Sequence, residues 1–379
     1  MKRRLALVFP GFEALAVEGH MRRFVREARK AAPLYGMDLA ISEPGYDATG
    51  PMRTGSLMVS ATGEGWSTET EIVIYDLGSC NALYAARNPL VRLVDGIVAT
   101  ADFAATGAAF AFFRTSWRFG VFYLYPTVLL LAALAAAFLA LGVLPASVPA
   151  GVAALAGVAV LAGLIAAAER FFLLLVAFDL WTFSRDLARS RNPDVEARLS
   201  AIEADVRRRV AETDVDEVLF CAHSIGAVSA VRAAAASAGD GRPGLERGLL
   251  TAGSSLLQVG LHPRAAWLRS RVGDLTATPV AWLDAQSLTD PINFYRSDPA
   301  KALTGREAPG LRTCRVRFRD QLAPETYRAI KLNLFRVHRQ FVFAVERRAH
   351  YSWHAIICGP ERFADIRDRG GLSPAWEAQ

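Results

Sequence analysis

Two uncharged apolar runs in the middle of the chain constrain its fold more than any other feature. Residues 126–144 contain no charged side chain, and residues 150–168 contain none either. Each run is close to the length of about 20 residues that a helix needs to cross the hydrocarbon core of a bilayer. The Pro-Ala-Ser-Val-Pro linker between them has room only for a tight turn. We therefore expect a transmembrane helical hairpin instead of two buried helices of a soluble protein.

The charges on either side of the hairpin predict its orientation. The linker is uncharged, whereas both flanks are basic, and positively charged flanks stay in the cytoplasm. We expect an integral protein of the inner or plasma membrane, with both termini cytoplasmic. An even number of crossings also allows segments before and after the hairpin to share one domain. The flanking residues are Arg114 and Arg118 before the first run, and Arg170, Arg185, Arg189 and Arg191 after the second.

Residues next to the two runs suggest where the membrane ends. Pro126 suits the first turn of a helix, and Phe122, Tyr123 and Tyr125 resemble an interfacial aromatic belt. Residues 171–183, rich in leucine and aromatic side chains, are expected to continue the second helix into the interface. Residues 90–113 are compatible with a helix against the membrane, but their pattern is too diffuse to place one.

The stretch around Ser224 is the second strong feature. Residues 218–221 form an apolar run typical of a short buried strand, and residues 228–235 have a helical composition. A serine at the apex of a sharp strand–turn–helix connection projects its hydroxyl out of the sheet. Ala222 and Gly226 are small, as a close pass of strand and helix requires, and the amide of Ile225 would point toward a forming oxyanion. The alternative is a serine that only caps the helix.

The sequence Ala222-His223-Ser224-Ile225-Gly226 resembles the nucleophile elbow of the α/β-hydrolase superfamily. Lipase-like members commonly read Gly-His-Ser-Leu-Gly, so Ala222 is a small departure. The resemblance implies an α/β-hydrolase-like fold, with a mostly parallel central sheet flanked by helices and interrupted by the hairpin. Residues 1–118 and 186–379 would then be two parts of one hydrolase domain, and residues 119–185 the hairpin with an interfacial helix.

Alternating strand and helix signals on both sides of the hairpin are consistent with such a sheet. Helices are expected at about residues 18–33 and from Pro193 onward, and residues 37–70 read as short strands and turns. Strands are expected at residues 4–9, 71–76, 218–221, 249–252, 279–285 and 314–319.

A serine nucleophile needs a base, and the base needs an orienting carboxylate. In α/β-hydrolases these follow the serine in the order acid, then histidine. The Asp290-Pro291 turn resembles the acid-bearing turn of many members, so Asp290 is the candidate acid; Asp284 is the runner-up, and Asp320 comes late. A purely turn-forming Asp-Pro pair is the competing interpretation.

The base is expected after the last strand, where His338, His350 and His354 are all eligible. We favour His338, because an aromatic a few residues after a histidine resembles the end of many lipase-like sequences. His223, next to the serine, is expected to support the elbow. The family's first central strand ends in a loop that donates a second oxyanion amide, which makes Phe12 in Pro10-Gly11-Phe12 the candidate. An ordinary strand-ending turn is as compatible with this sequence.

Other classes of function lack support. The four cysteines, Cys80, Cys221, Cys314 and Cys358, are far apart and read as buried free thiols. No metal-ligand spacing, phosphate-binding loop or dinucleotide motif occurs, so neither a metal nor a cofactor is expected. The net charge of +6 is spread along the chain without a basic patch containing aromatics, which argues against nucleic acid.

Together these features predict a membrane-anchored serine hydrolase, lipase- or esterase-like, that cleaves a lipophilic ester at the bilayer. A thioesterase or acyltransferase on the same scaffold is equally compatible with the residues. A non-catalytic membrane protein that binds or assembles partners is a further alternative, favoured if no histidine lies near Ser224. Nothing in the sequence indicates an oligomeric state.

Overall fold

A nine-stranded sheet forms the centre of the molecule. The computed structural model describes residues 2–48, 50–145 and 147–374. The strands follow the order β2-β4-β5-β1-β6-β7-β8-β9, with β3 paired to β4. Neighbouring strands are parallel from β5 to β9, and the pairs that involve β4 are antiparallel. The strands are β1 (Lys2–Phe9), β2 (Asp38–Ile41), β3 (Gly45–Asp47), β4 (Thr54–Gly63), β5 (Trp66–Tyr75), β6 (Glu217–His223), β7 (Glu246–Ala252), β8 (Ala281–Ser287) and β9 (Leu311–Val316).

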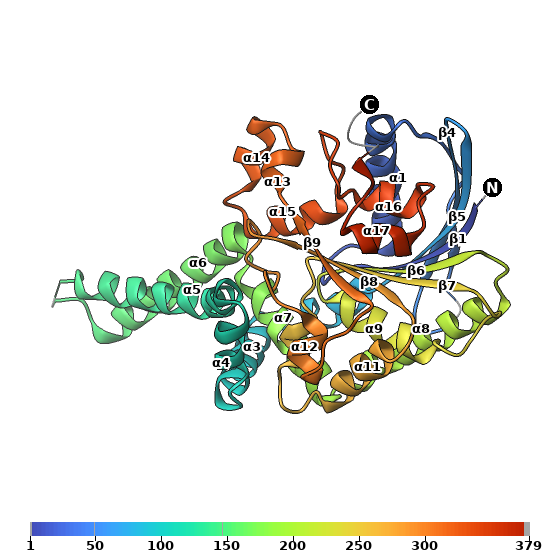
Figure 1. The fold of residues 1–379 in the computed structure, drawn as a ribbon. Helices are drawn as coiled ribbons and strands as arrows, with labels where there is room; N and C mark the ends of the chain where they lie inside the picture. The colour runs from blue at the N-terminus through green and yellow to red at the C-terminus, as the bar shows by residue number, and fades with distance from the viewer. Residues whose placement is uncertain (1, 49, 146, 375–379) are drawn as a thin grey trace.

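Helices cover both faces of this sheet (Figure 1). On β1, Leu5 and Leu7 point into one core, and Ala6 and Val8 point into the other, as alternation along a buried strand requires. The face of Leu5 is covered by α8 (Pro193–Glu212), α9 (Gly226–Ala236) and α11 (Ala266–Thr276). The opposite face is covered by α1 (Val17–Ala31), α16 (Trp353–Cys358) and α17 (Phe363–Arg369). The protein is therefore an α/β protein whose sheet combines segments from before and after the hairpin.

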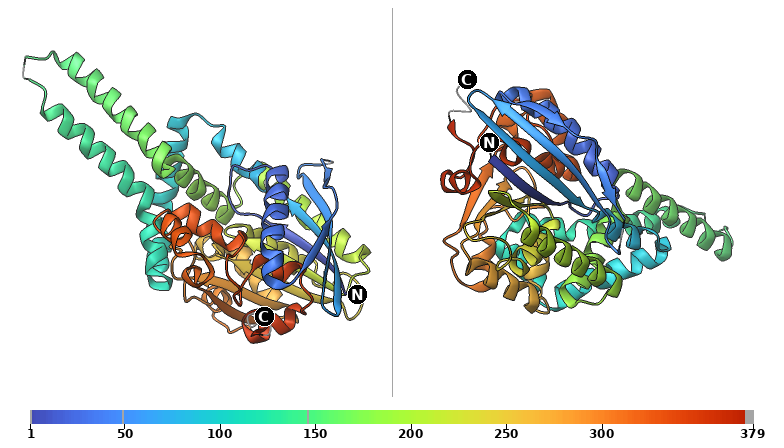
Figure 2. Two further views of the ribbon diagram at one scale, coloured as in Figure 1. Left: turned by 90° about the horizontal axis from the view of Figure 1, so that it is seen from above. Right: turned by 90° about the vertical axis from the view of Figure 1, so that its right-hand side faces the viewer.

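The hairpin consists of α5 (Trp117–Gly142) and α6 (Ala150–Phe172), and it protrudes from the body (Figures 1 and 2). Both helices are long and apolar enough to cross a membrane. Gly157 lies against Leu141, where an added Cβ would approach within 2.9 Å, so the small residue permits close packing of the two helices.

The first turns of α5 belong to the body of the protein. The helix begins at Trp117, so Pro126 lies inside it and not in its first turn as predicted. Phe122 and Tyr123 are buried, and the Tyr123 hydroxyl donates a hydrogen bond of 2.7 Å to the Thr100 carbonyl. The prediction that they form an interfacial belt is therefore wrong, because the body packs around them.

Of residues 171–183, which were expected to continue the second helix, only 171 and 172 do so. Leu173 has a left-handed backbone (φ 55°) that ends α6, and α7 (Leu174–Arg189) then turns back into the body. Trp181 and Phe178 are fully buried. α7 packs against α3 (Pro89–Ala105), which is followed at a bend of 72° by α4 (Ala108–Thr115). Arg185 and Arg189 pair with Asp102 of α3, so these two flanking arginines are structural.

The last strand has the expected length but lies three residues earlier in the sequence. β9 ends at Val316, and Phe318–Gln321 forms the short helix α13. The connections between the main elements are α2 (Gly78–Ala85), α10 (Leu256–Gly260), α12 (Pro299–Thr304), α14 (Pro324–Ile330) and α15 (Leu334–Arg339), with the 3₁₀ helices η1 (Ala32–Tyr35) and η2 (Gln340–Val342).

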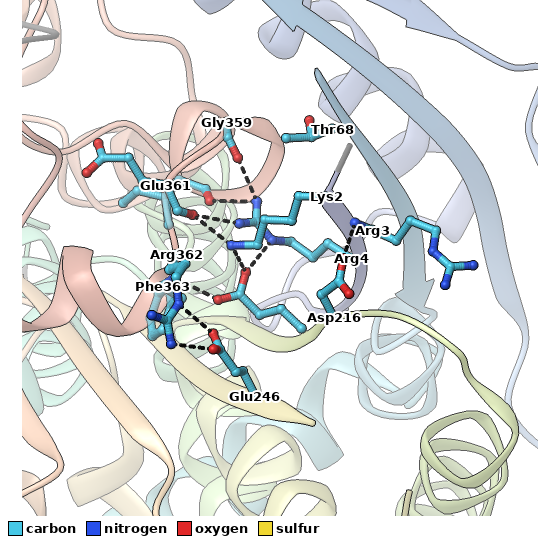
Figure 3. Close-up of polar contacts among 12 residues, drawn as sticks. Lys2, Arg3, Arg4, Thr68, Asp216, Glu246, Gly359, Glu361, Arg362 and Phe363 are labelled. Carbon is cyan, nitrogen blue, oxygen red and sulfur yellow. Dashed lines mark hydrogen bonds and ion pairs between the residues drawn. The ribbon is translucent and has the colours of Figure 1, made fainter. Parts of the chain in front are cut away.

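A buried ion pair joins the amino ends of β1 and β6 (Figure 3). Nε of Arg4 donates to the Glu217 carboxylate at 2.7 Å, and both side chains are about 1% exposed. Arg4 also donates to the carbonyls of Gly359 and Glu361, and the Phe363 amide donates to Glu217 at 2.7 Å. The remaining hydrogen bonds of the Arg4–Glu217 pair thus fix the C-terminal helices to the sheet.

Candidate functional site

Ser224 lies at a strained turn between β6 and α9. Its φ of 57° is left-handed, a conformation that a serine rarely adopts. Two hydrogen bonds to the end of the neighbouring strand hold it there: the Ser224 amide donates to the Ala252 carbonyl at 3.0 Å, and the Ser255 amide donates to the Ser224 carbonyl at 3.2 Å. The sharp turn predicted from the sequence is therefore present.

The loop after β1 passes against this turn with no room for side chains. A Cβ on Gly226 would lie 2.2 Å from the Phe9 carbonyl oxygen and 2.4 Å from that of Pro10. A Cβ on Gly11 would lie 2.9 Å from the Cβ of Ser224. The close approach that the small residues predicted is thus made by the end of β1 against the first turn of α9.

Asp290 and His338 meet at the carboxyl edge of the sheet. Asp290 follows β8, and its Oδ1 accepts a hydrogen bond of 2.9 Å from the Ile292 amide. Its Oδ2 lies 2.7 Å from Nδ1 of His338, on α15. Both side chains are buried. An ionised carboxylate can only accept, so it holds the Nδ1 proton in place and leaves Nε2 of the ring as a proton acceptor.

His338 and Ser224 line the same cavity. Nε2 of His338 is buried and has no hydrogen-bond partner among the described residues. The ring also lies beside Gly253, where an added Cβ would approach its Cε1 within 3.2 Å. His223 supports it from the other side, because its Nε2 lies 3.1 Å from the His338 carbonyl oxygen and the two rings are 4.7 Å apart.

The alternative acid and bases lie elsewhere. Asp284 is buried within β8 and accepts hydrogen bonds from Thr251 and Gln286, and burial raises its pKa to about 6. Nε2 of His350 lies 3.1 Å from the Arg315 carbonyl oxygen. His354 is buried in the core with its ring 5.2 Å from that of Phe24. Of the candidates, the structure brings together Asp290 and His338.

The two proposed oxyanion amides flank the serine. Phe12 follows Gly11 in the loop that contacts Ser224, and Ile225 is the next residue along the chain. Neither amide makes a hydrogen bond within the described part of the chain. Two amides without hydrogen bonds, one on each of the segments that meet at Ser224, are donors of the kind that an oxyanion needs.

A cavity of about 560 Å³ opens in front of Ser224. One part of its wall is apolar and includes Leu173 and Val176, from the junction between the hairpin and α7. Figure 1 shows that the hairpin leaves the body on this same side, beyond the carboxyl ends of the parallel strands. The remaining wall contains Gly11, Phe12, Glu13, Ala14, Leu15, Gly19, Arg22, Arg23, Arg26, Leu180, His223, Ile292, Phe335, His338, Arg339 and Phe343.

A second, smaller cavity behind the elbow was not foreseen from the sequence. It has a volume of about 30 Å³, enough for a water molecule, and three histidines line it: His20, His223 and His354. Burial lowers the pKa of His20 to about 4, with Arg23 contributing, and lowers the pKa of His223 and of His354 to about 3. Spacing within one segment could not have revealed this cluster, because its members come from three distant elements.

Arg23 lines both cavities and forms an ion pair with Glu13, which lines the larger one. Arg23 donates to Glu13 at 2.7 Å and lies 2.8 Å from Nδ1 of His20. Burial alone would raise the pKa of Glu13, but the Arg23 charge outweighs it and lowers that pKa to about 2. The pair therefore stays ionised at neutral pH.

The described residues contain no group of three or more histidine, cysteine, aspartate or glutamate side chains that could hold a metal ion. Cys80, Cys221, Cys314 and Cys358 are free and buried, as predicted.

Comparison of the chain with family models, with curated proteins and with solved structures gave no match.

Proposed function

We propose that the protein is a membrane-anchored serine hydrolase of the α/β-hydrolase type that cleaves a lipophilic ester. The observation behind this proposal is the left-handed Ser224 at the end of β6, sharing a cavity with a histidine whose Nδ1 is hydrogen-bonded to a buried aspartate. The order of serine, acid and histidine along the chain, after β6, β8 and β9, is that of α/β-hydrolases.

In the proposed reaction, Nε2 of His338 takes the hydroxyl proton of Ser224 as Oγ bonds to the ester carbonyl carbon. The amides of Phe12 and Ile225 stabilise the resulting oxyanion. Collapse of this intermediate breaks the ester C–O bond, and His338 donates its proton to the leaving alcohol. Water then attacks the acyl-serine with the same histidine as base, releasing the carboxylic acid and regenerating Ser224. Asp290 keeps the imidazole oriented throughout.

The apolar surface of the protein supports a location of this cavity at the bilayer. α3 exposes an apolar face next to the hairpin, with residues at helical spacing, and α4 adds exposed phenylalanines. Lying in the membrane surface, these helices would bring the cavity level with the lipid head groups. The exposed residues are Leu90, Val91, Val94, Ile97, Val98, Phe110 and Phe113.

Both termini are proposed to be cytoplasmic, from the basic residues beside the hairpin and its uncharged tip. Because all four native cysteines are buried, an impermeant maleimide can test this on added cysteines. Ser147→Cys, at the tip, should react from outside intact cells, and Glu64→Cys, in the β4–β5 turn, only after permeabilisation. The reverse pattern would contradict the orientation.

The function is tested by reaction of membrane fractions with a fluorophosphonate probe, which captures activated serines. We expect wild-type protein to react and Ser224→Ala to be unreactive. Ser229→Ala, on the following helix, is the matched control and should react like wild type. An unreactive but folded wild type would contradict the hydrolase and favour a binding or assembly role. A reactive wild type that transfers acyl groups to thiols or alcohols faster than to water would indicate an acyltransferase.

A further inference from the structure

The cavity in front of Ser224 has two chemically different sides. Leu173 and Val176 continue from the hairpin, and Leu180, Ile292 and Phe335 extend this apolar surface. Such a wall suits an acyl chain that enters from the bilayer, because it remains in contact with apolar groups along its path. This apolar wall alone does not distinguish one acyl ester from another.

The other side is basic. Four arginines line the cavity, Arg22, Arg23 and Arg26 from α1 and Arg339 from α15, against a single carboxylate, Glu13. Arg23 is occupied by Glu13, and Arg26 contacts Glu27 at 2.6 Å. Arg22 and Arg339 form no ion pair within the described part of the chain. The Arg22 charge acts on Glu18 only at longer range, and Nε of Arg339 donates to the Phe335 carbonyl at 3.2 Å, so neither guanidinium group is in contact with a carboxylate.

We infer that the substrate is an anionic amphiphile: an acyl ester with a phosphate or carboxylate group near the scissile bond. This inference rests on the proposed hydrolase function. The acyl chain lies along the wall of Leu173 and Val176, the carbonyl faces Ser224, and the anionic group lies against Arg22 and Arg339. Arginine is suited to this role because its planar guanidinium binds phosphate or carboxylate through two parallel hydrogen bonds.

The competing role for these arginines is attraction of the whole protein to an anionic membrane surface. The two roles differ in what they depend on. Substrate recognition depends on the charge of the molecule being hydrolysed, even when it is dispersed as a monomer. Surface attraction depends on the charge of the surrounding lipid and is independent of substrate charge.

The test compares two esters of one short acyl chain, one with a phosphate on the alcohol and one with a methylated, neutral phosphate. Hydrolysis is measured with purified full-length protein in neutral detergent, with both esters below their aggregation concentration. The variants are Arg22→Gln, Arg339→Gln and their combination. Arg29→Gln is the matched control, because Arg29 is an exposed arginine of the same helix outside the cavity.

We expect wild type to prefer the anionic ester. Each single variant should raise KM for that ester roughly 3- to 10-fold with little change in kcat, and the combination should raise it further. KM for the neutral ester should not change, Arg29→Gln should behave as wild type, and Arg22→Lys should recover part of the loss. Added salt should weaken the preference.

Equal hydrolysis of both esters by wild type, or equal losses on both in the variants, would overturn the inference. The inference would also be overturned if the variants lost activity only in anionic vesicles, whatever the charge of the substrate. That result would show that the arginines bind the membrane surface. Reaction of Ser224 with the fluorophosphonate probe is measured in the same preparations. If Ser224 reacts but the enzyme has no preference for the anionic ester, only the proposed substrate class is wrong. If Ser224 does not react, the proposed hydrolase function is wrong as well.

Discussion

Nδ1 of His338 lies 2.7 Å from Oδ2 of Asp290, although 48 residues of chain separate them. The contact forms because both residues follow parallel strands, whose carboxyl ends meet at one edge of the sheet. The same edge contains the turn of Ser224. Residues that are far apart in sequence are thus brought together by strand order, which is how open parallel sheets assemble their sites.

The first prediction concerns this pair. Asp290→Asn should lower the rate of fluorophosphonate reaction at Ser224 by roughly 10³- to 10⁴-fold, because an amide no longer holds the proton on Nδ1. Asp284→Asn should react within a few-fold of wild type, since its partners are Thr251 and Gln286. Rates are measured by quenched gel fluorescence. A larger loss for Asp284→Asn than for Asp290→Asn would assign the acid to Asp284.

The second prediction concerns the close pass of β1 and α9. Gly226→Ala places a methyl group 2.2 Å from the Phe9 carbonyl oxygen, which forces the turn of Ser224 to move. We expect the free energy of unfolding to fall by about 2 kcal/mol or more, with loss of probe reaction. Gly273→Ala is the control, because nothing lies within 4 Å of an added Cβ in that helix.

Gly273→Ala should leave probe reaction unchanged and stabilise the fold by roughly 0.5–1 kcal/mol, as alanine does in helix interiors. Unfolding in detergent is followed by tryptophan fluorescence. Equal effects of the two substitutions would show that the elbow tolerates a side chain at residue 226.

The third prediction concerns pH and the three buried histidines. His20, His223 and His354 have a pKa of about 4, 3 and 3 in the folded protein, below the usual value of about 6.5. The unfolded chain therefore binds their protons first, so stability is complete above pH ~6.5 and is lost as the pH falls. At pH 5.5 each histidine costs roughly 1.4 kcal/mol.

Asp284 has the opposite effect on the pH dependence of stability. Its folded pKa, raised to about 6 by burial, favours the protonated folded state, so acidification to pH 5.5 returns about 1 kcal/mol. Glu13, with its pKa lowered to about 2, stays ionised in this range. The histidines outweigh Asp284, and the unfolding midpoint should fall between pH 7.5 and 5.5.

A substitution of His354 tests most directly whether the buried histidines cause this pH dependence. Both of its ring nitrogens lack a partner among the described residues, so His354→Phe removes a titrating group without breaking a hydrogen bond. Its unfolding midpoint should depend less on pH than that of wild type. An unchanged slope in His354→Phe would contradict the assignment.

The features that could be predicted from the sequence are those that depend on residues close together along the chain. The strand, turn and helix around Ser224 have local signals, and the buried face of α8 follows from apolar spacing at Val195, Leu199 and Val206. The apolar runs likewise indicated the hairpin, because length and hydropathy suffice to recognise such helices. The choice of Asp290 and His338 came from two resemblances to family sequences, the Asp290-Pro291 turn and the aromatic that follows His338, and their contact agrees with it.

Features that depend on packing between distant segments were missed. Tyr123 looked interfacial, but α3 accepts its hydroxyl hydrogen bond and covers it. Leu173 has the left-handed backbone that ends α6 and redirects the chain into α7. The sequence does not mark this turn, because the residue there is leucine and not glycine, the usual signal for such a conformation. Arg4 occurred in a terminal basic run, where charges are usually solvated, and is buried only because Glu217 and the carbonyls of the last helices surround it.

The last prediction concerns that buried pair. Arg4→Met leaves Glu217, which is about 1% exposed, with Lys2 at 3.0 Å as its remaining cationic partner. We expect the free energy of unfolding to fall, by at most the roughly 3–5 kcal/mol that an uncompensated buried charge costs. Arg3→Met is the matched control, because Arg3 pairs with the exposed Asp214 and its loss should leave the stability close to that of wild type. Unfolding is measured by denaturant titration in detergent.

The double variant Arg4→Met/Glu217→Met separates charge from packing. Removing both charges leaves only Lys2, whose side chain is 17% exposed, without its carboxylate partner, so the double variant should be more stable than Arg4→Met alone. The C-terminal helices would still lose the hydrogen bonds to Gly359, Glu361 and Phe363, so proteolysis near residues 356–363 should be faster than in wild type. A double variant less stable than Arg4→Met would mean that these hydrogen bonds, and not the ion pair, dominate at the amino edge of the sheet.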